Sequence, residues 1–184
     1  MRRQAHHIIT AVLVGVLLLS GWKTARAAAT WARAPHAGER TGLATPRDAP
    51  VRAPAGSPLA EVARAQRAIV FVYLPDCQVC HANMANWIDL VGETRDADVD
   101  LYAVAPAQPA HTAAAQDYWA GLDRHVRVIT ATPAGVHAAF GVGNTPATLL
   151  IQDGRVRGEI LGALTPAGKA AVLRFARSGL AQRR

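Results

Sequence analysis

The only two cysteines of the chain stand three residues apart, in the segment Cys77-Gln78-Val79-Cys80-His81. A Cys-x-x-Cys pair beside alternating strands and helices is typical of a thiol–disulfide redox centre, whereas Cys-x-x-Cys-His is also the motif of covalent haem attachment. A structural disulfide across so short a loop would stabilise the fold little. The pair therefore predicts reactivity, and the neighbouring elements have to decide between the two chemistries.

A buried strand is expected before the cysteines and a helix after them. Residues 68–74 are a continuous run of β-branched and aromatic side chains, typical of a strand buried on both faces. Pro75-Asp76 ends this run, and a helix is expected from Cys77 to about Val91. The amino terminus of a helix favours negative charge, which suits an attacking thiolate. Cys80, on the same helix face, is placed to resolve a mixed disulfide.

The rest of the chain alternates between the two types of element. Further strands are expected at 98–105, 126–130, 147–151 and 156–161, and further helices at 59–66, 113–122, 133–140 and 166 to about 178. Ser57 is expected to cap the first helix, and Gln152-Asp153-Gly154-Arg155 to form a hairpin turn. This order predicts an α/β fold with a parallel core sheet, helices on both faces and an antiparallel edge from the hairpin.

The chain begins with the pattern of a secretory signal. Residues 1–27 contain Arg2-Arg3, an apolar run and a small-x-small cleavage site at Ala25-Arg26-Ala27. The run is shorter than the roughly 20 residues that span a bilayer, although an uncleaved anchor would export the domain in the same orientation. Residues 28–57 are rich in Ala, Pro and Arg, which predicts a disordered linker or a loose mature terminus. We therefore expect a folded domain over 58–184, in the periplasm or tethered to the inner membrane.

Charge and ligand types exclude several other classes of protein. Four of the charges behind the net charge of +7 lie in the signal, and the remaining basic residues are scattered, so no nucleic-acid surface is predicted. A Cys77/Cys80/His81 metal site lacks a fourth ligand at a familiar spacing. A haem bound by His81 would also need a ligand on its other face. Met84 stands too close to His81 to reach that face, and the histidines at 111, 125 and 137 lie in no recognisable haem-binding pattern. No metal or cofactor is expected, and Trp87 and Trp119 are interpreted as packing residues.

Together, these features resemble the thioredoxin superfamily, and within it the exported branch typified by TlpA and ResA. The resemblance covers roughly Ala68 to Arg177 and includes the segment 140–151, which matches a Gly-Val-x-x-Thr-Pro-x-x-x-Leu-Ile pattern before an Asp-Gly hairpin. It implies a thioredoxin-like fold with a central mixed sheet flanked by helices and an inserted strand–helix unit at about 99–122. It also implies that Pro146 is a cis-proline beside the cysteines and that Thr145 offers backbone groups to a substrate strand.

Four positions depart from the family pattern. Asp76 replaces the usual Trp before the first cysteine, Ala85 a helix-kinking proline, Asn83 an acid, and Phe71 the buried acid of thioredoxin itself. Asp76 would oppose ionisation of its neighbour by like charge, and His81 becomes an electrostatic neighbour or a surface residue. The direction of electron flow is therefore open.

The sequence predicts an exported, monomeric thiol–disulfide oxidoreductase, with Cys77 as nucleophile and Cys80 as resolver. Its partners would be protein thiols and disulfides, together with an upstream electron donor. The resemblance favours a reductase. An isomerase or oxidase of a secretion or conjugation system is the nearest alternative, and a c-type cytochrome and a redox-inert binding module are alternatives of another class.

Overall fold

The computed structural model describes residues 44–106, 113, 117, 119 and 125–181. The predicted signal, the linker up to residue 43 and most of the helix expected at 113–122 lie outside these residues. Within them, no helix combines the length and the apolar character that crossing a membrane requires.

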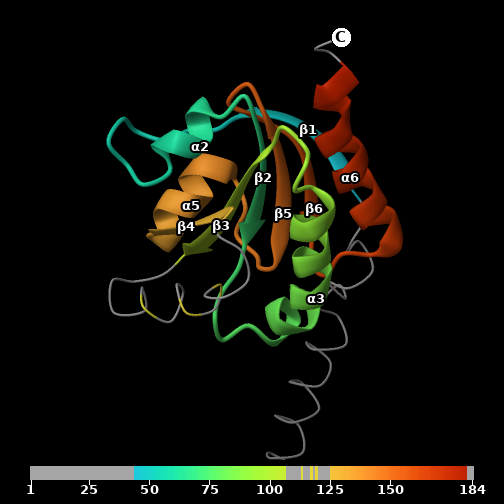
Figure 1. Ribbon diagram of the computed structural model, residues 1–184. Helices are drawn as coiled ribbons and strands as arrows, with labels where there is room; N and C mark the ends of the chain where they lie inside the picture. Colours follow the sequence, from blue (N-terminus) through green and yellow to red (C-terminus); the bar gives the residue numbers. More distant parts are fainter. Residues whose placement is uncertain (1–43, 107–112, 114–116, 118, 120–124, 182–184) are drawn as a thin grey trace, which may run out of the picture. The chain divides into compact units, whose positions relative to one another are not determined.

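A six-stranded mixed sheet forms the centre, in the order β1-β6-β5-β2-β3-β4 (Figure 1). Its strands are β1 (Thr45–Pro50), β2 (Arg67–Val72), β3 (Asp100–Pro106), β4 (Val126–Ala131), β5 (Ala147–Gln152) and β6 (Arg155–Leu161). The strands β2, β3 and β4 are parallel, whereas β5 runs antiparallel to β2, β6 to β5 and β1 to β6.

The central mixed sheet flanked by helices, which the resemblance implied, is confirmed, and it differs in two ways from the parallel core with an antiparallel edge that the order of elements alone predicted. β5 is antiparallel although it pairs with β2 at the centre of the sheet, and β1 rather than the hairpin forms that edge. β3, the strand of the expected insert, lies between β2 and β4, so β4 forms the other edge. The predicted turn between β5 and β6 is confirmed, with Asp153 and Gly154 at φ of 51° and 67°, as a tight hairpin turn requires.

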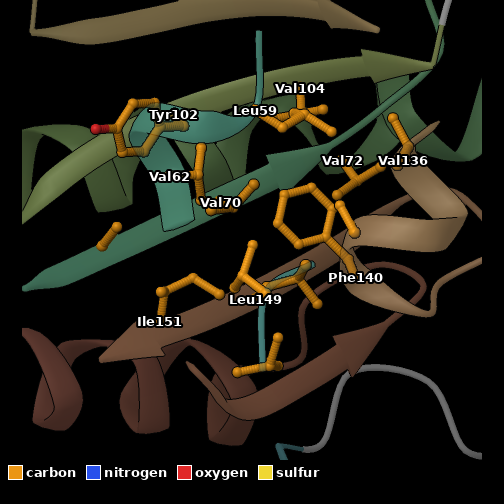
Figure 2. Packing of buried hydrophobic residues seen from close by; sticks show 14 of the residues in the cluster. Leu59, Val62, Val70, Val72, Tyr102, Val104, Val136, Phe140, Leu149 and Ile151 are labelled. Carbon is orange, nitrogen blue, oxygen red and sulfur yellow. The ribbon is translucent and has the colours of Figure 1, made fainter. Parts of the chain in front are cut away.

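Helices cover both faces of the sheet because β2 buries side chains on both sides. Ile69, Phe71 and Tyr73 pack against the helices α3 (Gln78–Glu93) and α6 (Pro166–Ala181). Val70 and Val72 face the helices α2 (Ala60–Arg64) and α5 (Pro133–Phe140) instead, in the cluster of Figure 2. This division follows the alternation of side chains along a strand, and it holds β2 and therefore the loop that leads to Cys77 in place.

The structure begins its folded part upstream of the expected Pro58. Thr45–Pro50 pairs with β6, and the next residue, Val51, is buried and donates its N–H to the Gly154 carbonyl at 2.9 Å. Prolines are tolerated here because an edge strand leaves part of its backbone unpaired. The expected Ser57 cap is also wrong, since Leu59 is the N-cap of α2 and makes no side-chain capping bond.

Candidate functional site

Cys77 occupies the N-cap of α3, directly after the loop that follows β2. Its backbone is extended, and its Sγ accepts the N–H of Cys80 at 3.2 Å. The sulfur thus takes the place of the oxygen that Ser, Thr or Asp usually supplies at this position. The side chain is half-buried, and negative charge on it would lie at the favourable end of the helix. This is the geometry of an accessible nucleophile.

Cys80 lies one turn further along α3 and is fully buried. Both cysteines are free thiols. Burial raises the pKa of the Cys80 thiol to about 12, and the hydrogen bond with Cys77 adds to the rise, whereas the Leu74 backbone and the Thr145 side chain act in the opposite direction. The two thiols therefore differ sharply in access to solvent although they share one helix.

The Thr145–Pro146 peptide bond is cis, as the resemblance implied. The Thr145 carbonyl lies 4.0 Å from the Cys77 sulfur. Pro146 is buried, and its own carbonyl accepts the N–H of Gly162 at 2.7 Å. The fold thus brings together four residues that the sequence predicted as a site, from two segments almost 70 residues apart, with Thr145 exposed enough to meet a ligand.

Asp76 and His81, the predicted modulators, lie at the rim of this site. Both side chains are exposed. The Nε2 of His81 lies 2.7 Å from the Pro75 carbonyl, so the ring links the first turn of α3 to the loop before Cys77. His81 is therefore a neighbour of the thiols that contacts the backbone supporting one of them.

The roles of Leu74 and Asn83 near the thiols were not predicted from the sequence. The backbone of Leu74 acts on Cys80, and no side-chain pattern signals a backbone group. Asn83, at the position of the family acid, is buried, and its Oδ1 accepts the N–H of Leu164 at 2.8 Å and the Nδ2 of Asn86 at 3.0 Å. The amide therefore fixes α3 to the loop before α6.

Cys80 packs in one buried cluster with aromatic side chains, and Trp87 and Trp119 are packing residues within it, as predicted. Trp87 is fully buried in the same cluster as Cys80 and donates its Nε1–H to the Thr148 hydroxyl at 3.0 Å. The rings of Phe71, Trp87 and Trp119 contact one another, with centroids 5.4 Å apart for Phe71 and Trp87, 5.5 Å for Phe71 and Trp119, and 5.9 Å for the two tryptophans. These contacts pack the face of α3 that carries Cys80 against the sheet.

The site does not fit a haem. A haem joined to both cysteines needs open space beside both sulfurs, but Cys80 is fully buried among protein side chains, and the His81 Nε2 that would bind iron contacts a carbonyl instead. Across the part of the chain that the structure describes, no group of three His, Cys, Asp or Glu side chains is arranged for a metal ion. A cavity of about 620 Å³ lies at the end of β2 that is far from the cysteines, where Arg127 and Asp100 form an ion pair. Neither cysteine lines it.

Comparison with solved structures identifies this architecture. A putative thiol:disulfide interchange protein DsbE from Chlorobium tepidum matches with a TM-score of 0.53 and 16% identity, over 77% of this chain and 98% of that one. This chain has the thioredoxin fold. The thioredoxin domain of a thiol-disulfide oxidoreductase from Bacteroides vulgatus matches with a TM-score of 0.52 and 11% identity, over 74% and 95%.

A secreted disulfide oxidoreductase from Mycobacterium tuberculosis shares this thioredoxin fold, with a TM-score of 0.50 and 13% identity over 64% of this chain and 85% of that one. No family model and no curated protein matches the sequence. At such identities the likeness shows the fold, and the activity has to be argued from the thiols themselves.

Proposed function

We propose that this thioredoxin-fold protein is a thiol–disulfide oxidoreductase that exchanges disulfides with protein substrates. The observation that carries the proposal is the pairing of a half-exposed sulfur at the N-cap of α3 with a buried thiol one turn behind it. The names of the structural neighbours support the same class of reaction. A redox-inert binding module does not require one half-exposed and one buried thiol.

The reaction proceeds in two exchanges. The Cys77 thiolate attacks one sulfur of the substrate disulfide, that S–S bond breaks, and the departing substrate sulfur takes up a proton. Cys80 then loses its proton and attacks the Cys77 sulfur, which releases the second substrate thiol. The substrate gains two electrons and two protons, and the protein becomes a Cys77–Cys80 disulfide. A protein dithiol must then reduce that disulfide, so an upstream electron donor belongs to the cycle.

Thr145 and Pro146 are proposed as the platform for the substrate. Thr145 is partly exposed and its carbonyl faces the Cys77 sulfur, so an extended substrate segment that reaches this sulfur also passes Thr145. The fixed position of Pro146, held by the bond from Gly162, keeps this edge in place.

We infer that the protein acts as a reductase. Strong oxidants of this kind have a stabilised reduced form. Burial keeps Cys80 protonated, so such stabilisation would have to come from charge on Cys77, and the inference of a reductase is supported instead by the resemblance to the exported TlpA and ResA branch. A reduction potential well below that of the glutathione pool would support the reductase, and a potential above it would favour an oxidase or isomerase.

Export is proposed from the signal pattern and from a neighbour described as secreted. Cell fractionation followed by amino-terminal sequencing tests it. A periplasmic protein that begins at Ala28 would show cleavage, and a membrane-bound protein that begins at Met1 would show an anchor.

Substitution of each cysteine tests the reaction. With dithiothreitol as donor, the wild type should reduce a disulfide-bonded model protein, and Cys77→Ser should not. Cys80→Ser retains the attacking sulfur but lacks the resolver, so after reduction and removal of dithiothreitol it should accumulate a mixed disulfide with the substrate. Reduction at the wild-type rate by Cys77→Ser would refute the assignment.

A further inference from the structure

A small apolar pocket opens beside the proposed platform. It has a volume of about 160 Å³ and is lined by Val72 and Leu74, by Val136 and His137 of α5, and by residues 142–145. Figure 2 shows Val72 and Val136 at one end of the core cluster. Both residues line the pocket, which therefore borders the buried apolar side chains of this face. Neither cysteine lines it.

The pocket exists in part because Gly143 has no side chain. A Cβ at this position would lie 3.8 Å from the Nδ1 of His137, which is ordinary contact, and the backbone lies outside the left-handed region, so a larger residue is tolerated. Gly143 itself is exposed, so the space next to it is open to a ligand.

The size and chemistry of the pocket limit what it can hold. Small-molecule sites in proteins have volumes of roughly 300 to 1,000 Å³, so this pocket is too small for a cofactor. Its volume corresponds to about five water molecules, which suits one side chain. His137 is the only titratable residue in its lining, and the valines and Leu74 make the interior apolar. An aliphatic side chain fits this space best.

Thr145 connects the pocket to the chemistry. It lines the pocket, and its carbonyl lies 4.0 Å from the Cys77 sulfur. An extended segment advances about 3.3 Å per residue and alternates its side chains. A substrate whose cysteine reacts with Cys77 therefore brings a side chain from one or two residues away to the mouth of the pocket.

We propose that this pocket binds an aliphatic side chain of the protein substrate next to its reacting cysteine, and so selects disulfides flanked by residues such as Leu. This inference rests on the proposed oxidoreductase function. Because the contact is made before the sulfur exchange is complete, the selection acts on the rate of substrate reduction and not on the thiols themselves.

Two peptides test the selection. Each carries one cysteine joined to glutathione by a disulfide, flanked on both sides by Leu in one peptide and by Ser in the other. Filling an apolar pocket changes kcat/KM by about tenfold or more, so the reduced wild type should favour the Leu peptide by this factor. In Gly143→Leu the new side chain occupies the pocket, and the preference should disappear.

Gly92→Leu is the matched control, because a Cβ at Gly92 meets nothing within 4 Å and the residue lies in α3 outside the pocket. It should keep the preference, and it should reduce hydroxyethyl disulfide, which has no side chains, at the wild-type rate. Equal rates for the two peptides with the wild type, or a preference that persists in Gly143→Leu, would overturn the inference alone. A wild type that reduces neither peptide nor hydroxyethyl disulfide would instead overturn the proposed function, and the inference with it.

Discussion

The raised pKa of Cys80 leads to a prediction that can be measured without a substrate. Cys77→Ser isolates Cys80 as the only thiol of the chain. It replaces the sulfur that hydrogen-bonds Cys80, which is the second cause of the rise, by a hydroxyl, but it leaves burial, which is the largest. The pKa of Cys80 in this variant should therefore remain well above its ordinary value of 9.0, although below the value of about 12 in the wild type.

The size of the effect follows from the fraction of thiolate. At pH 8 a thiol with a pKa of 12 is ionised to roughly one part in ten thousand, about a thousandfold less than one with a pKa of 9. The ultraviolet absorbance of the thiolate gives this fraction directly, and the double variant Cys77→Ser/Cys80→Ser subtracts the contribution of tyrosines. A midpoint above pH 10 is expected while circular dichroism shows the protein to be folded.

The same shift links pH to stability. Because the folded pKa lies above the unfolded one, the folded state is favoured fully below about pH 9 and loses stability as pH rises toward 12. Relative to the double variant, the loss should reach up to about 1.4 kcal/mol per pH unit in this window. A thiolate midpoint at or below pH 9 in the folded protein, with no difference in stability between the two variants, would refute the account of Cys80 as a desolvated thiol.

Two further predictions concern the support of the site. Thr148→Val should lower the free energy of unfolding in urea by about 1–3 kcal/mol, because the buried Trp87 Nε1–H loses its acceptor; Thr148→Ser keeps the hydroxyl and should lose less. His81→Ala should slow alkylation of Cys77 by roughly a few-fold, because the loop before this thiol loses its contact with α3 at Pro75. His81→Gln can restore a hydrogen bond to the Pro75 carbonyl and should recover the rate. An unchanged rate in His81→Ala, or no recovery in His81→Gln, would contradict this role.

The elements nearest the cysteines were predictable because their signals are local. The apolar run before Pro75 leaves few alternatives to a doubly buried strand, and the cysteine that follows it is indeed the N-cap of α3. The Asp153-Gly154 turn was equally clear, because few residues accept its positive φ angles. Each of these features depends on a handful of neighbouring residues.

Features that depend on distant pairing were not predictable from local patterns alone, and the mixed sheet and the place of Pro146 beside the cysteines were implied only by the family resemblance. β1 is held by β6, more than 100 residues away, and its own composition indicates only a linker. The reversed direction of β5 is likewise a property of the path of the chain, because a strand has the same composition in either direction. The pocket depends on the absence of a side chain at Gly143 next to α5, and no motif records an absence.

The arrangement of the two thiols also determines which of them can begin the reaction. Along one helix turn, the cap position leaves Cys77 half-exposed, while the next turn carries Cys80 into the cluster of Phe71 and Trp87. A substrate disulfide can therefore meet only the first sulfur, and the second acts once the mixed disulfide has formed beside it. Because Cys80 is protonated at neutral pH, the release of its proton belongs to this second step. We therefore expect the resolution step to accelerate as pH rises above neutrality, and a rapid-quench measurement of the decay of the mixed disulfide between pH 7 and pH 9 tests it; a decay rate that does not change with pH would contradict this account.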